Sequence, residues 1–247
     1  VFVQWGDGNN SNPRTIFVDN NLSLTANYIT QHYLTVNRNP SYVGETTGEG
    51  WYENGTIATA TCTSPVPWSA GTRYLFTNWS GDASGTSTSL ELTMDSPKTV
   101  TANYKRQYNV TFQQSGCDVF PNVTIDDVSY TLPCSFWLDD GSSPTFSYES
   151  PVSGDPGVRY AITYASPTSP LTVHYSTTVT GYYKTQFYIT VSSARGALTQ
   201  SQWVDKNSSP TFSVESPTDT ITDQTRWRCT GFSVDQADSQ EGTSYKF

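Results

Sequence analysis

The side chains that most often carry catalysis are scarce in this chain. The sequence has two histidines, His32 and His174, and neither belongs to a His-Glu-x-x-His, Gly-x-Ser-x-Gly or phosphate-loop motif. His32 takes a position that Tyr108 and Phe187 take elsewhere in the chain, which favours a structural role. The turn at residues 7–12 offers oxygen ligands to Ca²⁺ but lacks the terminal acidic residue of an EF-hand loop. We therefore expect no enzyme activity and no resident metal or cofactor.

The four cysteines do not have the spacing of a metal site, because no Cys-x-x-Cys pair occurs. Cys117 and Cys134 flank residues 122–131, which read as a hairpin. A bridge between them would close a loop of 16 intervening residues and would stabilise the fold by about 3 kcal/mol. We predict this disulfide, and the alternative is two thiols that merely flank a hairpin. Cys62 and Cys229 take apolar strand positions and are expected to stay unpaired.

Seven asparagines stand in the Asn-x-Ser/Thr pattern of N-glycosylation, a modest excess over chance. The alternative is that a β protein rich in threonine produces the pattern by composition alone. Because a disulfide and a repetitive sequence both indicate a location outside the cell, we expect some of them to carry glycans. They are Asn9, Asn21, Asn54, Asn78, Asn109, Asn122 and Asn207.

The charge balance argues against two classes of partner. The chain has 13 Lys and Arg residues against 22 Asp and Glu residues, a formal net charge of −9. Nucleic-acid binders gain much of their affinity from clustered cations, and anionic bilayers attract cations in the same way. No apolar run approaches the length that spans a bilayer. We expect no nucleic-acid partner and no membrane segment in this chain.

A repeat of about 76–79 residues organises the whole sequence. Similar strand-like runs contain Gln31, Gln107 and Gln186, which lie 76 and 79 residues apart. A second block has a tryptophan followed at a fixed distance by Ser-Pro, and its tryptophans are Trp51, Trp137 and Trp203. A third block begins with Arg73, Arg159 and Arg226. Because the tryptophans recur at one repeat position, we expect them to pack in the core of every copy.

The repeat divides the chain into four parts. Residues 1–30 are the C-terminal part of a repeat, or strands donated to a neighbour. Residues 31–106 form a complete repeat, and residues 107–185 form a second one that carries the disulfide-closed hairpin. Residues 186–247 form a repeat that lacks its last strand.

Each repeat reads as a set of short β-strands. Apolar and polar residues alternate in runs such as 90–94 and 99–104, and clusters of Gly, Asn, Asp, Ser and Pro separate the runs. No ten residues hold a helical apolar stripe. We predict an all-β chain of tandem small antiparallel β-sandwich domains of the immunoglobulin type. The alternative is a β-grasp repeat, which needs a helix, but the only candidate at residues 65–71 is interrupted by prolines.

Four motifs of the first complete repeat carry a resemblance to a known family. They are Tyr-Leu-Thr-Val at 33–36, Gly-Trp-Tyr-Glu-Asn-Gly-Thr at 50–56, Phe-Thr-Asn-Trp-Ser-Gly-Asp at 76–82 and Lys-Thr-Val-Thr-Ala-Asn-Tyr at 98–104. The pattern resembles the divergent InlB B-type repeats of large bacterial and archaeal surface proteins, with the archaeal versions closer. It is weakest in residues 107–185, where Ala165 replaces the tryptophan of the third motif. The resemblance implies an extracellular, cell-surface and non-enzymatic role.

The two ends of the chain complement each other. Residues 186–247 lack a counterpart of the strand at 99–104, and residues 1–30 contain one. The side chains that would enter a neighbour in this assembly strand are Leu22, Leu24, Ala26 and Tyr28. We therefore expect a head-to-tail homopolymer formed by strand addition, and the alternative is that a longer repeat chain continues and supplies its own strands.

The function that follows is a structural one. We expect a subunit or segment of an extracellular filament, stalk or array. The alternative is an adhesin or a carbohydrate-binding surface module, in which aromatic residues outside the repeated tryptophan position, such as Trp68, stack on sugar rings.

Overall fold

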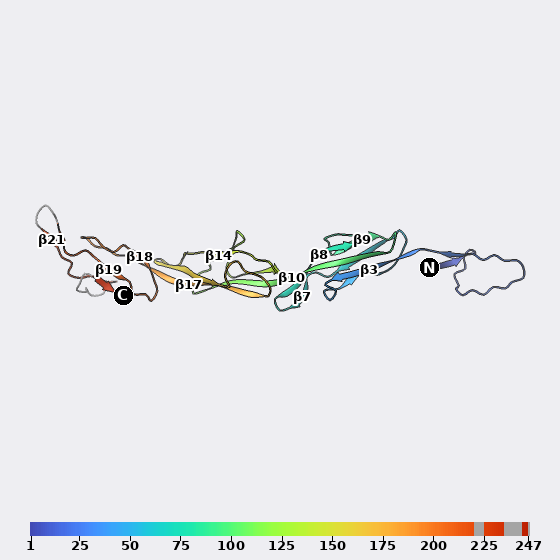
Figure 1. Cartoon of the computed structure of the whole chain (residues 1–247), viewed down its shortest axis with the longest axis horizontal. Helices are drawn as coiled ribbons and strands as arrows, with labels where there is room; N and C mark the ends of the chain where they lie inside the picture. The colour runs from blue at the N-terminus through green and yellow to red at the C-terminus, as the bar shows by residue number, and fades with distance from the viewer. Residues whose placement is uncertain (220–224, 235–243, 247) are drawn as a thin grey trace. The chain divides into compact units, whose positions relative to one another are not determined.

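The computed structural model describes residues 1–219, 225–234 and 244–246, and these residues form strands and loops only (Figure 1). The all-β fold class is confirmed. The β-grasp alternative requires a helix, and none occurs among the described residues. In the same residues no helix is long and apolar enough to cross a membrane.

The chain divides into two compact units. The first contains Val1–Asn109, Trp137–Gly141 and Val173–Ser176, and the second contains Val110–Phe136, Ser142–Thr172 and Thr177–Phe247. The limits of the units fall inside two strands, β10 (Lys98–Ser115) and β13 (Cys134–Asp139). The division of the chain into four repeat segments stays a prediction, but strand pairing follows its alignment at several places described below.

In the first unit, residues 31–106 fold into two β-sheets. The strands of one sheet are β3 (Gln31–Asn39), β5 (Gly50–Glu53), β7 (Val66–Ser69), β8 (Thr72–Gly81) and the first part of β10. The strands of the other are β4 (Thr46–Thr47), β6 (Ile57–Cys62) and β9 (Ser89–Thr93). Alternate residues of both sheets meet in one core, as period-2 patterning predicts.

Strand β10 is the central strand of this repeat. It runs parallel to β3 and antiparallel to β8, with Val100 opposite Val36 on one side and Gly81 on the other. Val100 and Trp79 are fully buried in the core. Gly81 has φ +106°, and a Cβ there would lie 2.4 Å from the carbonyl oxygen of Thr99, so only glycine fits this point of the Trp-Ser-Gly-Asp motif.

The second unit contains a similar pair of layers. Its larger sheet has the second part of β10, β15 (Val152–Ser153), β16 (Val158–Ser166), β17 (Thr177–Ile189) and β18 (Gln202–Asp205). Its three-stranded sheet has β11 (Asn122–Ile125), β12 (Val128–Thr131) and β14 (Phe146–Tyr148). The rings of Phe112 and Phe146 pack between the layers with centroids 5.4 Å apart. Strands β11 and β12 confirm the hairpin expected at residues 122–131.

The remaining strands of the second unit pair as their counterparts in the complete repeat do. Strand β20 (Thr218–Asp219) pairs with β21 (Arg226–Trp227), and β19 (Thr211–Ser213) pairs with β22 (Ser244–Lys246). Phe212 lies opposite Tyr245, as Ala60 lies opposite Leu90 in the β6–β9 pair. Tyr245 and Lys246 of β22 therefore take the register positions that Leu90 and Glu91 take in β9.

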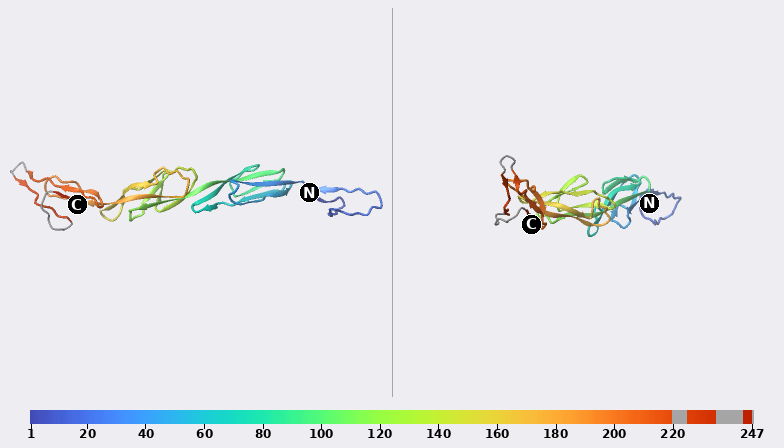
Figure 2. Two further views of the ribbon diagram at one scale, coloured as in Figure 1. Left: turned by 60° about the horizontal axis from the view of Figure 1, so that its bottom comes forward. Right: turned by 60° about the vertical axis from the view of Figure 1, so that its left-hand side comes forward.

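Residues 1–30 form a two-stranded hairpin from β1 (Phe2–Trp5) and β2 (Ala26–Tyr28), drawn in blue in Figure 2. The Cα partners are Phe2 with Tyr28, Gln4 with Asn27 and Trp5 with Ala26. The β8–β10 pair has the same register at three positions, including the same one-residue shift. Its Cα partners there are Phe76 with Tyr104, Asn78 with Asn103 and Trp79 with Ala102. The hairpin is thus a second copy of the β8–β10 pair without the rest of its repeat.

Candidate functional site

Two tryptophans of the repeated block each lie under an arginine side chain. The guanidinium carbon of Arg73 lies 4.4 Å from the ring centroid of Trp137. The guanidinium carbon of Arg159 lies 4.5 Å from the ring centroid of Trp203. At this distance the quadrupole of the indole ring attracts the cation, typically by about 0.5–2 kcal/mol. Both tryptophans are half-buried in these contacts.

A chain of polar contacts continues the first arginine contact. Arg73 Nε donates a hydrogen bond to Gln107 Oε1 (2.9 Å), and Gln107 Nε2 donates to Asp139 Oδ1 (2.7 Å). Lys105 Nζ donates to the other carboxylate oxygen of Asp139 (2.8 Å). Strand β13 carries both Trp137 and Asp139, and strand β10 carries both Lys105 and Gln107.

The second arginine contact is followed by the same series of hydrogen bonds between the same atoms. Arg159 Nε donates to Gln186 Oε1 (2.7 Å), Gln186 Nε2 donates to Asp205 Oδ1 (2.6 Å), and Lys184 Nζ donates to Asp205 Oδ2 (2.7 Å). We call each set of five side chains, with its arginine, lysine, glutamine, aspartate and tryptophan, an arginine–tryptophan joint. Each joint lies within one compact unit.

The carboxylates of both joints are held in their charged form. Burial alone would raise the pKa of Asp139, but the hydrogen bonds from Lys105 and Gln107 keep it below its ordinary value. Hydrogen bonds from Lys184 and Gln186 lower the pKa of Asp205. The joints are therefore ionic at neutral pH.

Trp51 has the same strand partners, but among the described residues no arginine lies over its ring. In the β3–β5 pair, Gln31 lies opposite Glu53 and Tyr33 opposite Trp51. In the β17–β18 pair, Gln186, Asp205, Tyr188 and Trp203 take the same places, and the Tyr–Trp ring centroids are 5.2 Å apart in both pairs.

The core role expected for the repeated tryptophan is wrong for Trp51, which is 67% exposed. The rings of Trp137 and Trp203 are each covered by an arginine of the preceding repeat, whereas no described arginine lies over Trp51. The tryptophan that fills the core is Trp79, and its indole N–H donates to the carbonyl of Ser87 (2.9 Å).

The same hydrogen bond to a serine hydroxyl occurs in three repeats and identifies equivalent positions in them. In each, the serine of the Ser-Pro motif accepts a hydrogen bond from a backbone N–H in the strand that carries the joint arginine. The acceptors and donors are Ser64 and Phe76 (3.1 Å), Ser150 and Ile162 (3.0 Å), and Ser216 and Cys229 (2.7 Å). The joint arginine stands three residues before the donor in both complete repeats. Before Cys229 that residue is Arg226, whose side chain is exposed.

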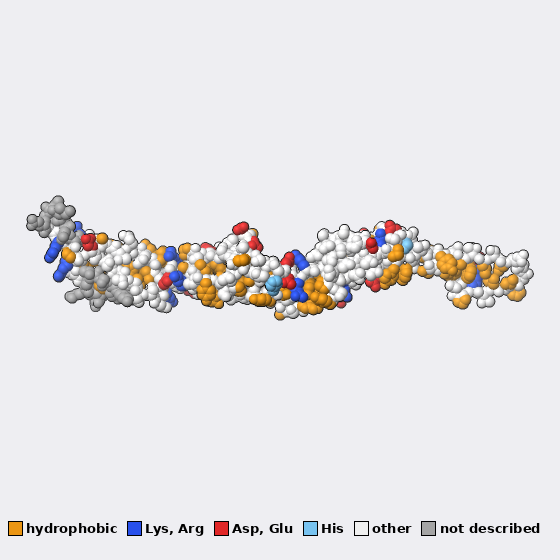
Figure 3. Space-filling view, in the orientation of Figure 1, with side chains coloured by type: hydrophobic (Ala, Val, Ile, Leu, Met, Phe, Trp, Pro, Cys, Tyr) orange, Lys and Arg blue, Asp and Glu red, His pale blue; other side chains and the backbone are white. Residues whose placement is uncertain are grey.

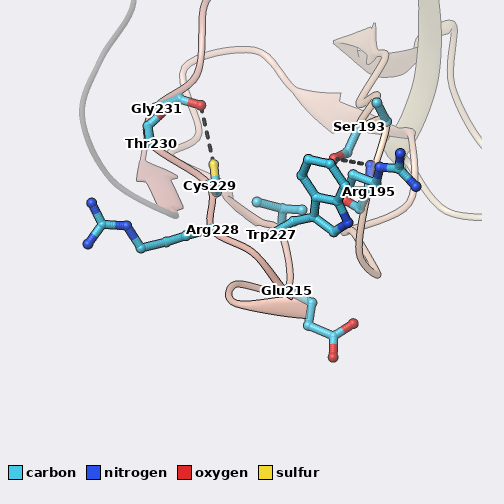
Figure 4. Close-up of a pocket in the computed structure, with 10 residues that line it drawn as sticks. Ser193, Arg195, Glu215, Trp227, Arg228, Cys229, Thr230 and Gly231 are labelled. Carbon is cyan, nitrogen blue, oxygen red and sulfur yellow. Dashed lines mark hydrogen bonds between the residues drawn. The ribbon is translucent and has the colours of Figure 1, made fainter. Parts of the chain in front are cut away.

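In residues 186–247 a groove takes the place of the central strand. It is a cavity of about 280 Å³ between residues 193–195 on one side and residues 227–231 on the other (Figure 4). These segments align with the end of β3 and with β8, which flank β10 in the complete repeat. Among the described residues of this repeat, no strand runs between them. The guanidinium of Arg195 lies 4.6 Å from the ring of Trp227 in the groove.

The assembly strand predicted from the sequence is exposed. Leu24 is 45% and Tyr28 70% exposed, Leu22 is exposed, and Ala26 is half-buried. Their counterparts Val100 and Ala102 are fully buried in β10. Figure 3 shows the hydrophobic side chains that gather on this N-terminal segment.

Cys62, Cys117 and Cys134 form no disulfide in this structure. Cys117 is buried and Cys134 half-buried, they flank the β11–β12 hairpin, and burial raises the pKa of both. The disulfide stays a prediction. Cys62 is half-buried against the first core, and Cys229 Sγ donates to the carbonyl of Gly231 (3.3 Å).

The predicted glycosylation sites fall into two groups. Those exposed to solvent are Asn9, Asn21, Asn54 and Asn207, and those half-buried in strands are Asn78, Asn109 and Asn122. The amide nitrogen of Asn78 donates to the carbonyl of Trp79 (3.0 Å), and the amide oxygen of Asn122 accepts from Thr131 (2.9 Å). The exposed group is therefore the one open to modification.

The residues weighed for catalysis or metal binding have structural partners. His32 Nε2 lies 3.1 Å from Asn54 Oδ1, and His174 Nδ1 lies 2.9 Å from Asp140 Oδ1. In the turn weighed as a calcium site, the carboxylate of Asp7 accepts two hydrogen bonds from Arg14. No group of three or more His, Cys, Asp or Glu residues in the described part of the chain is placed to hold a metal ion.

Sequence reasoning missed the joints, although their signal is present in the sequence. The motif Trp-x-Asp occurs at 137–139 and 203–205, Trp-x-Glu at 51–53, and Lys-x-Gln at 105–107 and 184–186. An acidic residue that recurs two residues after each tryptophan points to an ionic contact rather than to a core position.

Comparison with known proteins agrees with the repeat. The model of the divergent InlB B-repeat domain matches residues 34–108. The match does not separate archaeal from bacterial members. Neither a curated protein nor a solved structure matches the chain. The matched span covers β3 to the middle of β10, so it contains the sandwich and its central strand. Residues 34–108 are thus similar to the divergent InlB B-repeat domain, and this similarity suggests a surface-associated repeat module.

Proposed function

We propose that this protein is a structural subunit or segment of an extracellular cell-surface filament, stalk or array built from tandem β domains. The repeat family, the tandem copies and the two arginine–tryptophan joints support this function. The acidic surface and the four exposed sequons suit a position outside the cell.

The observation that carries the proposal is the match between the groove and the N-terminal strand. The groove is lined by the two segments that would flank a central strand, but no described strand lies between them. Residues 22–28 have the sequence of a central strand, but their apolar side chains are exposed. Exposed apolar strands and open sheet edges are sites of association. The assembly strand of one copy would enter the groove of the next copy, parallel to residues 189–193 and antiparallel to residues 226–232.

Strand β1 already holds the assembly strand in the register that β8 has on β10. Insertion would exchange β1 for residues 226–232 of the neighbour without a change of register. This exchange of one element for an identical pairing partner is a low-cost route to association.

The experiment is a deletion of residues 1–30, mixed in increasing amounts with the intact chain. A chain without the assembly strand offers a groove but no strand, so it should bind one end of growing fibres and shorten them in electron micrographs. As a control, addition of the same amount of intact chain should leave the fibre length unchanged or increase it. If the deleted chain leaves fibre length unchanged, the strand is supplied by a longer polypeptide, as in the alternative.

A second candidate function, carbohydrate binding, is favoured by one exposed aromatic cluster. Trp68 is 51% exposed and its ring lies 5.4 Å from that of Tyr42 and 5.6 Å from that of Tyr74, centroid to centroid. Exposed Trp and Tyr rings can stack on sugar rings. On a glycan array, Trp68→Ala should abolish binding if this cluster is a sugar site, whereas Trp51→Ala should not. Equal binding by wild type and Trp68→Ala would exclude it.

A further inference from the structure

The exposed aromatic cluster of Trp68, Tyr42 and Tyr74 has a cation beside it, Arg106. We propose that the cluster and Arg106 form one binding site for an acidic sugar, in which Trp68 stacks on the sugar ring and Arg106 binds its carboxylate. The inference rests on carbohydrate binding as the candidate function of this cluster, and it names the class of sugar, a pyranose that carries a carboxylate, such as a uronic acid.

Arg106 lies at the hydroxyl end of the cluster. Its guanidinium carbon is 5.4 Å from the ring centroid of Tyr74. Its Nε and Nη2 donate hydrogen bonds to the Tyr74 hydroxyl (3.0 and 2.8 Å), and its Nη1 donates to the Tyr108 hydroxyl (3.2 Å). The hydroxyl of Tyr42 lies 3.5 Å from that of Tyr74. The polar end of the cluster therefore holds one cation and three tyrosine hydroxyls.

The charge of Arg106 has no carboxylate to balance it in the described part of the chain, where none of the ion pairs includes this residue. The backbone N–H of Asp140 donates to the Arg106 carbonyl (3.0 Å), but the Asp140 carboxylate lies 2.9 Å from His174 Nδ1. A guanidinium has five N–H donors, and the hydrogen bonds to the tyrosines use three of them. The two that remain, one on each Nη atom, can donate to both oxygens of a carboxylate, a geometry that arginine favours.

The other side of the cluster offers an apolar surface to a sugar ring. Trp68 and Tyr42 are 51% and 57% exposed, whereas Tyr74, which contacts both rings, is almost fully buried. Figure 3 shows hydrophobic side chains gathered over β7 with basic side chains beside them. Because Tyr74 contacts Trp68 with its ring and Arg106 with its hydroxyl, one short oligosaccharide can reach both. Aromatic walls with a few placed polar groups are typical of small-ligand sites.

Trp68 has no counterpart in the second complete repeat. The β7–β8 pair and the β15–β16 pair have the same register, with Tyr160 at the position of Tyr74. In that register Gly154 takes the position of Trp68. A Cβ on Gly154 would lie 2.9 Å from the ring of Tyr160, so the ring packs on the backbone there and leaves no room for a side chain.

The cation is also absent from the second complete repeat. Arg106 is the Cα partner of Tyr74, and Thr185 is the Cα partner of Tyr160. The Tyr160 hydroxyl donates instead to the carboxylate of Asp118 (3.0 Å). The serine hydrogen bonds recur in both complete repeats, as contacts that build the repeat do. The cluster with its cation occurs in one repeat only, so the repeat fold does not require it, and a ligand accounts for its composition.

The net charge of the chain makes a preference for acidic sugars informative. At a formal net charge of −9, the chain as a whole repels anionic glycans. A preference for an acidic sugar over its neutral counterpart therefore has to come from a local cation, and Arg106 is the cation at this cluster.

The first arm of the test measures binding of the full-length chain to a glycan array in which each acidic oligosaccharide stands beside its neutral counterpart. The pairs are glucuronate with glucose and galacturonate with galactose, in the same linkage. Wild type should bind the acidic member about 10- to 100-fold more tightly, the usual gain for hydrogen bonds to a charged group. Trp68→Ala should lose binding to both members, because the stacking surface is lost.

The second arm removes the cation and keeps the aromatic surface. Arg106→Gln should bind the acidic and the neutral member equally. Arg106→Thr should do the same, and it introduces the residue that the second repeat carries at this position, which the fold accommodates. Lys206→Gln removes an exposed cation outside the cluster and is the matched control, which should keep the wild-type preference. Melting curves followed by circular dichroism check that each variant is folded.

The outcomes separate the class of sugar from carbohydrate binding itself. Equal binding of acidic and neutral members by wild type, or an acidic preference that survives in both Arg106 variants, would overturn the inference and leave carbohydrate binding standing. No binding of wild type to any member would contradict carbohydrate binding and this site with it. Loss of the acidic preference in both Arg106 variants, but not in Lys206→Gln, supports both.

Discussion

A single tryptophan position shows how the environment of a residue can depend on the neighbouring repeat. Trp137 and Trp203 are half-buried because an arginine of the preceding repeat lies over each ring. Trp51 has the same strand partners without the arginine and stays exposed. Recurrence at one repeat position therefore indicates a shared contact here, and not burial in each core.

The two kinds of tryptophan should respond differently to truncation. Trp79→Ala removes a fully buried ring from the first core and should destabilise its repeat by about 3–5 kcal/mol. Trp51→Ala should change the stability of the monomer by less than about 0.5 kcal/mol, because it is a surface substitution. Urea denaturation followed by circular dichroism measures both. A Trp51→Ala midpoint as low as that of Trp79→Ala would show that the exposed position is a core position.

The joint carboxylates predict a pH dependence. Because the folded pKa of Asp139 lies below its ordinary value of 3.8, the charged carboxylate adds stability that is fully present above the ordinary value and is lost as the pH falls through the folded pKa. The melting temperature of wild type should therefore fall as the pH drops below about 4, and Asp139→Asn should flatten that fall. Asp155→Asn, in an exposed turn, is the control. Parallel melting curves for wild type and Asp139→Asn would show that the ion pair contributes nothing.

Strands were predictable from the sequence where the signal is local. Alternation predicts β9 and the first part of β10, and residues 122–131 read as the hairpin that β11 and β12 form. The joints were not predictable in this way, because each combines residues from three strands, as Arg73, Gln107 and Trp137 do. The alternation of apolar and polar residues within one strand does not indicate which distant strand will place a side chain over a tryptophan at the end of a repeat.

The β11–β12 hairpin is the element on which the predicted disulfide depends. It is closed at its base by a hydrogen bond from Leu132 N–H to the carbonyl of Pro121 (3.0 Å), and Cys117 and Cys134 lie just outside that base. In protein isolated from an oxidising compartment, peptide mapping without reduction should link Cys117 to Cys134 and leave Cys62 and Cys229 as thiols. A Cys62–Cys229 link would instead contradict the repeat assignment, since it would join different repeats.

For the whole molecule, the repeat predicts a chain whose incomplete parts complement each other. The N-terminal hairpin repeats the register of β8 and β10 without a core, and residues 186–247 have a groove where a central strand belongs. The sequence alone indicates which segments correspond. It could not show that the groove is open or that Leu24 and Tyr28 are exposed, because both depend on the packed structure.

The most direct test of strand addition is binding of the assembly strand as a peptide. A synthetic peptide of residues 20–30 should bind the chain that lacks residues 1–30 at one peptide per chain, measured by titration calorimetry. It should also raise the melting temperature of that chain, since ligands that bind only the folded state stabilise it. A control peptide with Leu24→Asp and Ala26→Asp puts charges at two positions that are buried in the complete repeat and should not bind. Saturable binding of the native peptide alone is the result predicted here, and equal binding of both peptides, or none of either, would contradict strand addition.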